Sequence, residues 1–104
     1  MNKILENLKN KEAYLQRKLQ QLQQWEHVIN ILRTRADKSK TNHNPELRKH
    51  IGNILVQKAR SEYKLRQLQQ ASNEEWNTTK TGLEKSWIEL RAAFLIASAG
   101  PTKN

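Results

Sequence analysis

The feature that most constrains this chain is a seven-residue repeat of apolar residues in its first third. The repeat consists of Leu8, Leu15, Leu22, Ile29 and Ala36. Two helical turns take close to seven residues, so a sustained repeat of this period keeps one apolar stripe turned toward a partner helix. The positions between are mostly Lys, Gln, Glu and Arg. The pattern predicts a first helix over about residues 2–36 that packs against other helices.

Composition favours an all-α fold in a single domain over residues 1–104. Only 36% of the chain is apolar, 28% is charged, and there are three Gly and two Pro. A sheet would need frequent turn residues, which are missing. The absence of cysteine excludes disulfides and thiolate metal sites. With no apolar segment typical of a secretory signal or of a membrane span, we expect a cytoplasmic protein without a transmembrane segment.

A loop is predicted over residues 37–44, followed by a second helix from about residue 45 to about residue 98. Asn44 is a favoured capping residue, and Pro45 suits the first helical position because its missing N–H would have no partner there. Apolar residues then keep helical spacing as far as Ala97. Gly100 and Pro101 are expected to end the helix and to leave residues 99–104 as a disordered tail.

The second helix carries one ambiguity, near Ser72. Ser72 and Glu75, with Trp76 directly after them, match the capping box that begins many helices. No Gly or Pro precedes them, however, and the apolar spacing continues through this segment without a slip. We therefore favour one continuous helix, with a break near Ser72 as the alternative.

A continuous second helix would extend far beyond the first, leaving an apolar overhang over residues 83–98. Exposed large apolar side chains forfeit roughly 1.5–3 kcal/mol each relative to full burial, so a patch of this kind indicates an interaction surface. We expect a homo-oligomer, most simply a dimer, in which the two overhangs pair. The alternatives are a folded-back third helix, another protein or a membrane surface. The expected interface residues are Trp76, Leu83, Trp87, Leu90 and Phe94.

The chain is strongly basic, with a net charge of +9 and a pI of about 10.1. All of the excess positive charge precedes residue 72. This distribution would suit nonspecific binding of nucleic acid or another polyanion, although motifs typical of DNA-binding domains are missing. A solvated helical exterior explains the charge more simply. The candidate polyanion-binding residues, clustered around the predicted loop, are Arg33, Arg35, Lys38, Lys40, Arg48 and Lys49.

Candidates for chemistry are few. Glu46 and His50 have the helical spacing of some metal ligands, but an ordinary surface pair explains them better. The sequence contains no nucleotide-binding, zinc-protease or serine-hydrolase motif. We predict no catalytic, cofactor-binding or metal-binding residues, and we expect no enzyme activity.

One C-terminal segment has the pattern Trp76-x3-Lys80-x-Gly82-x-Glu84-Lys85-x-Trp87-x2-Leu90-x2-Ala93-Phe94-x2-Ala97. It resembles the C-terminal segment of a group of small soluble bacterial coiled-coil proteins of unknown function. The resemblance covers about a quarter of the sequence. It implies a helical, soluble protein and supplies no catalytic residues.

The leading hypothesis from the sequence is a noncatalytic coiled-coil interaction or structural protein, built as a long antiparallel helical hairpin and completed by self-association. Nonspecific polyanion binding through the basic helical arms is the alternative. Peripheral binding to a membrane or a partner through the apolar C-terminal helix is the third hypothesis.

Overall fold

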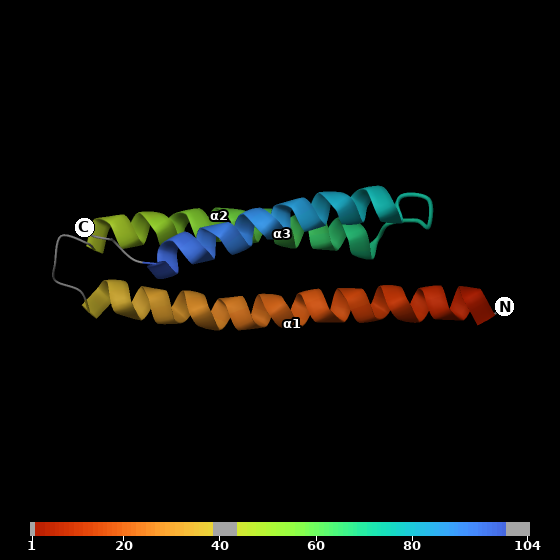
Figure 1. Ribbon diagram of the computed structural model, residues 1–104, viewed down its shortest axis with the longest axis horizontal. Helices are drawn as coiled ribbons and strands as arrows, with labels where there is room; N and C mark the ends of the chain where they lie inside the picture. The colour runs from red at the N-terminus through yellow and green to blue at the C-terminus, as the bar shows by residue number, and fades with distance from the viewer. Residues whose placement is uncertain (1, 39–43, 100–104) are drawn as a thin grey trace.

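The computed structural model describes residues 2–38 and 44–99, and it confirms an all-α fold. Its three helices are α1 (Asn2–Lys38), α2 (Asn44–Gln69) and α3 (Trp76–Ala99). α2 runs antiparallel to α1, and α3 folds back so that it runs parallel to α1 (Figure 1). The molecule is elongated, with extents of 61 × 21 × 20 Å. No helix in the described part of the chain is long and apolar enough to cross a membrane.

Most helix boundaries agree with the sequence. α1 continues two residues beyond its predicted end at residue 36, and α2 begins at Asn44, next to Pro45. The capping side chain predicted for Asn44 lies outside the described part of the structure. The same is true of most of the predicted loop, residues 39–43, and of the predicted tail beyond Ala99.

The continuous second helix favoured by the sequence is wrong, and the break near Ser72 is confirmed. α2 ends at Gln69, and the backbone N–H groups of Gln70 and Ala71 donate hydrogen bonds to carbonyl groups in its last turn. The Glu75 N–H then donates to Ser72 Oγ at 3.2 Å, while the Ser72 N–H donates to Glu75 Oε1 at 3.4 Å. This is the reciprocal capping box, and such caps are worth about 1 kcal/mol.

Burial explains why the chain turns here instead of continuing as a helix. The turn gives up only a few helical hydrogen bonds, and the capping box replaces part of them. In exchange it brings α3 onto α1 and α2, where Leu83, Trp87, Leu90 and Phe94 are buried. At roughly 1.5–3 kcal/mol for each such side chain, burial outweighs the loss. The predicted overhang over residues 83–98 is therefore wrong.

The heptad residues of α1 become steadily more buried toward its C-terminus. Leu8 is 52% exposed and Leu15 is half-buried, whereas Leu22 is 8%, Ile29 1% and Ala36 0% exposed. The cause is the greater length of α1, whose N-terminal end extends past the turn between α2 and α3 (Figure 1). The uncovered end of this bundle is thus the start of α1.

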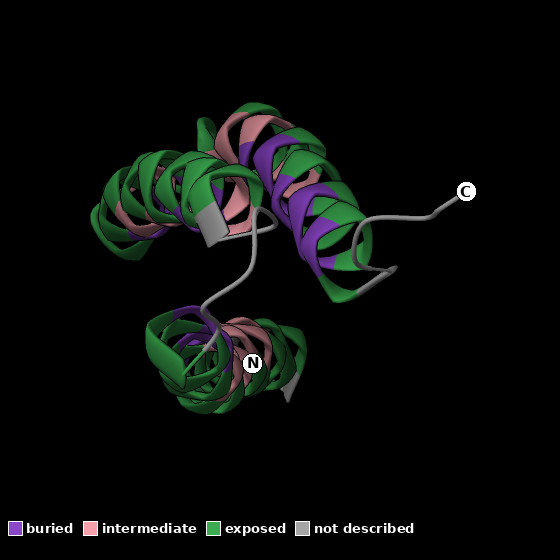
Figure 2. Cartoon of the chain, turned by 90° about the vertical axis from the view of Figure 1, so that its left-hand side faces the viewer, coloured by how far each residue is buried: buried purple, intermediate pink, exposed green. Residues whose placement is uncertain are grey.

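The three helices enclose one elongated core along their common axis, and the buried residues face inward (Figure 2). One cluster, at the C-terminal end of α1, includes Ile29, Ile54 and Leu90, and a second cluster nearer the 70–75 turn includes Leu68 and Leu83. Trp25 packs against both clusters and so joins them.

The two interfaces of α3 differ in character. Where α3 meets α2, the small buried residues Ser61 and Ser86 share a hydrogen bond of 2.8 Å, so the helices approach closely. Where α3 meets α1, the contacts are made by large side chains of α1, including Tyr14 and Trp25. These large side chains keep α1 and α3 further apart than α2 and α3, so polar groups fit between α1 and α3. The candidate site lies there.

Candidate functional site

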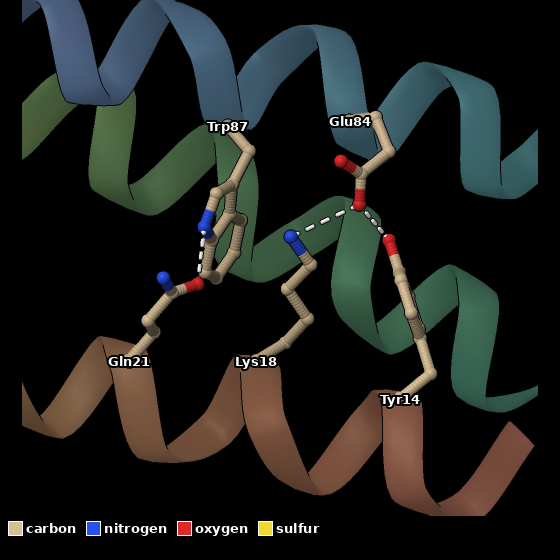
Figure 3. Close-up of polar contacts among 5 residues, drawn as sticks. All are labelled: Tyr14, Lys18, Gln21, Glu84 and Trp87. Atoms are coloured by element: carbon tan, nitrogen blue, oxygen red, sulfur yellow. Dashed lines mark hydrogen bonds and ion pairs between the residues drawn. The ribbon is translucent and has the colours of Figure 1, made fainter. Parts of the chain in front are cut away.

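A network of polar side chains connects α1 with α3 (Figure 3). Lys18 on α1 forms an ion pair of 2.9 Å with Glu84 on α3, and the Tyr14 hydroxyl donates a hydrogen bond to the same carboxylate. One turn further along, Trp87 Nε1 donates to Gln21 Oε1 at 2.8 Å. The Lys18 ammonium lies 4.5 Å from the centre of the Trp87 ring, a favourable cation–π distance.

The pKa values of Tyr14 and Glu84 move apart. Burial raises the pKa of Tyr14, and the hydrogen bond to Glu84 and its negative charge raise it further, well above the usual 10.0. Burial also raises the pKa of Glu84, but the hydrogen bonds from Tyr14 and Lys18 and the charges of Lys18 and Lys80 outweigh it, so the net pKa falls below 4.5. Neither group exchanges a proton near neutral pH, which is typical of a structural contact and not of acid–base catalysis.

Four of the five predicted interface residues are buried by the chain itself. Leu83, Trp87, Leu90 and Phe94 are at most 7% exposed. Trp25 stacks at a tilt against Trp87, with ring centres 4.9 Å apart, and against Phe94, with ring centres 5.3 Å apart. The residues do form an interface, but it lies between helices of one chain, so they are not free to contact a second copy.

The fifth predicted interface residue, Trp76, is half-buried at the start of α3. It lines a groove of about 650 Å³ between α1 and α3, beside the 70–75 turn. Three cations line the same groove, Lys11 and Arg17 from α1 and Lys80 from α3, together with Tyr14. The groove is further lined by the amide side chains of Asn7, Asn10, Asn73 and Asn77. No described Asp or Glu lines it.

The predicted polyanion cluster is only partly assembled at the opposite end of the bundle. Arg33 and Arg48 line one hollow between α1 and α2, but Asp37 lies in the same hollow and pairs with Arg48 at 2.8 Å. Arg35 and Lys38, at the end of α1, and Lys49, near the start of α2, are exposed. Lys40 lies outside the described residues. A carboxylate thus neutralises part of this cluster.

The structure contains no arrangement suited to a metal ion among its described residues. His50 and Glu46 lie 3.8 Å apart as a neighbouring pair on α2, but no group of three or more His, Cys, Asp or Glu comes together in residues 2–38 and 44–99. The pair lacks the further ligands that a protein metal site needs.

Sequence reasoning missed the groove between α1 and α3. Lys11 and Arg17 could be seen only as two of many basic residues on the first helix, and Lys80 lies in the electrically neutral C-terminal part of the chain. Their proximity depends on the fold-back of α3. The match of Ser72 and Glu75 to a capping box was the one sequence signal that pointed to it.

Comparison with protein-family models, curated proteins and solved structures gives no match for this chain. The resemblance of residues 76–97 to small bacterial coiled-coil proteins stays a prediction.

Proposed function

We propose that this protein is a noncatalytic helical interaction protein that pairs with a second copy of itself through the outer face of α3. The observation that supports this is an exposed apolar stripe formed by Ile88, Ala92, Leu95 and Ile96. Ile88 is 61%, Leu95 66% and Ile96 54% exposed. Their spacing places them on neighbouring turns of one side of the helix. Large apolar side chains gathered in this way mark an interaction surface.

Charge favours a second copy as the occupant of this stripe. α1 carries eight basic and four acidic residues, and α2 carries six and two, so two copies would repel each other through those helices. From Ser86 to its end, α3 carries only Glu89 and Arg91, which balance. Two copies of a protein with a net charge of +9 would therefore meet with least repulsion through α3.

Sedimentation equilibrium at tens of micromolar protein tests this proposal. We expect the wild-type chain to have the mass of a dimer. The double variant Ile88→Gln/Leu95→Gln should have the mass of a monomer, because it removes apolar contact area without changing the charge. The matched control is Val56→Gln/Tyr63→Gln, which replaces two exposed residues of α2 that are each 56% exposed. This control should remain dimeric.

A monomeric wild-type chain would reject self-association through the stripe. If that monomer also floated with liposomes, and if the Ile88→Gln/Leu95→Gln variant did not, the stripe would bind a lipid surface. Equal dissociation of both double variants would likewise reject a specific α3 interface.

A second candidate function is nonspecific binding of nucleic acid or another polyanion along α1 and α2. It is favoured by the small number of neutralised cations: among the described residues, the Lys and Arg side chains in ion pairs are Lys18, Arg48 and Lys58. Binding of duplex and single-stranded DNA should weaken steeply between about 50 and 200 mM salt, because neutralised phosphates release counterions. Affinity that does not change with salt would exclude it.

A further inference from the structure

We propose that the groove between α1 and α3 is a binding site for a small ligand that carries two or three closely spaced phosphate groups. The site is defined by Lys11, Arg17, Lys80, Tyr14 and Trp76. This proposal does not depend on self-association, since the groove lies at the opposite end of α3 from the apolar stripe.

Two of the three cations of this groove, Lys11 and Lys80, are held in place by neutral groups. The Lys11 ammonium lies 4.9 Å from the centre of the Trp76 ring and also contacts Asn73 Oδ1. The Lys80 ammonium lies 4.7 Å from the centre of the Tyr14 ring. Aromatic rings and amides are neutral, so they orient a cation while leaving its full charge available to a ligand.

Some other cations of the bundle are neutralised by carboxylates. Lys58, between α1 and α2, is paired with Glu26 at 2.8 Å and with Glu62 at 2.9 Å. Arg48 is paired with Asp37. In the described part of the chain no ion pair involves Lys11, Arg17 or Lys80. The hollow next to the groove contains a carboxylate, Glu84, but that group is paired with Lys18. Glu84 offsets part of the charge of Lys80, whereas Lys11 and Arg17 lie in a groove that no described carboxylate lines. The groove therefore keeps a net positive charge.

The chemistry of the lining points to phosphate. Three cations around one hollow favour a ligand that carries several negative charges in a small volume, as linked phosphates do. Lysine binds phosphate as a point charge, and the guanidinium of Arg17 can donate two parallel hydrogen bonds to one phosphate group. A volume of about 650 Å³ lies within the range typical of small-molecule sites. Inorganic tripolyphosphate and nucleoside triphosphates share this chemistry.

Titration calorimetry with tripolyphosphate tests the proposal, and Trp76 supplies a fluorescent probe inside the groove. We expect saturable binding of one tripolyphosphate per chain. The triple variant Lys11→Gln/Arg17→Gln/Lys80→Gln should bind at least about tenfold more weakly, because the loss of even one hydrogen bond to a charged group weakens binding by about that factor.

The matched control is the triple variant Lys9→Gln/Arg60→Gln/Arg66→Gln. These three residues are exposed and lie outside the groove, and their replacement lowers the net charge by the same amount. The control should bind within about threefold of the wild-type affinity, a small loss due to the weaker overall field. Circular dichroism should show that both triple variants keep their helix content.

These measurements distinguish a nucleotide ligand from an inorganic polyphosphate, and they also show whether the proposal is wrong. If ATP binds more tightly than tripolyphosphate and Trp76→Leu removes the difference, the ligand is a nucleotide whose base contacts Trp76. Equal affinity for both would support recognition of the phosphates alone. If both triple variants lose affinity equally, the binding is diffuse attraction by the net charge, and the proposal is wrong. An absence of saturable binding would also overturn it.

Discussion

Replacing Trp87 with alanine is expected to lower the free energy of unfolding by about 3–5 kcal/mol, the usual cost of truncating a buried aromatic residue. The Trp87 ring is 1% exposed and packs against Trp25. Its N–H donates to Gln21 at 2.8 Å, and the truncation would leave that amide without its partner. Domains of this size are stable by about 5–15 kcal/mol, so the variant should melt far below the wild-type chain.

Denaturant unfolding followed by circular dichroism measures this loss. Ile88→Ala is the control, because Ile88 lies next to Trp87 on α3 but is 61% exposed; it should change the free energy of unfolding of the monomer by no more than about 0.5 kcal/mol. Trp87→Phe keeps most of the ring packing and removes only the N–H donor, so its loss should be intermediate. An unchanged melting temperature for Trp87→Ala would mean that α3 does not pack against α1 as described.

The core of this protein was largely predictable because it depends on periodicity within single helices. The heptad residues Leu22, Ile29 and Ala36 are buried as the repeat predicts, and four of the five predicted C-terminal interface residues are buried as well. Local chemistry also identified the start of α2 next to Pro45, and it offered the capping box at Ser72 as the alternative to a continuous helix. These features are decided by residues within about one helical turn of each other, which a single sequence displays.

The partner of each helical face was not predictable in the same way. The apolar spacing around Ser72 is equally consistent with a continuous helix and with a fold-back, because a turn of this length hardly disturbs the pattern. The capping box points to the fold-back, but the burial of Trp87 and its neighbours decides it, and that burial depends on contacts between residues more than sixty positions apart, such as Gln21 with Trp87. The expectation of an uncovered overhang was wrong for this reason.

The sequence also could not show which basic side chains pair with carboxylates. A count of basic residues treats Lys11, Lys58 and Lys80 alike. In the fold, burial lowers the pKa of Lys58, but the hydrogen bonds and charges of two carboxylates outweigh it and leave the pKa raised. Lys11 and Lys80, in contrast, lie against neutral aromatic rings. Which cations remain available to a ligand is therefore a property of the helix packing, and the groove is the place where the packing leaves them together.

The second large effect on stability is expected from substitutions at the contact between α2 and α3. Ser61 and Ser86 are 0% and 2% exposed, and their hydroxyl groups share one hydrogen bond of 2.8 Å. Ser61→Ala removes one partner and leaves the Ser86 hydroxyl buried without it, so it should lower the free energy of unfolding by about 1–3 kcal/mol. Ser86→Ala should have an effect of similar size.

The double variant Ser61→Ala/Ser86→Ala should be more stable than either single variant, because it removes both polar groups and leaves two small apolar side chains in close contact. Denaturant unfolding of the four proteins completes a double-mutant cycle. Ser98→Ala, on the exposed side of α3, is the control for the helix propensity gained with alanine. If the two single losses simply add in the double variant, the hydrogen bond does not couple the helices, and the close approach of α2 and α3 depends on the small size of these residues alone.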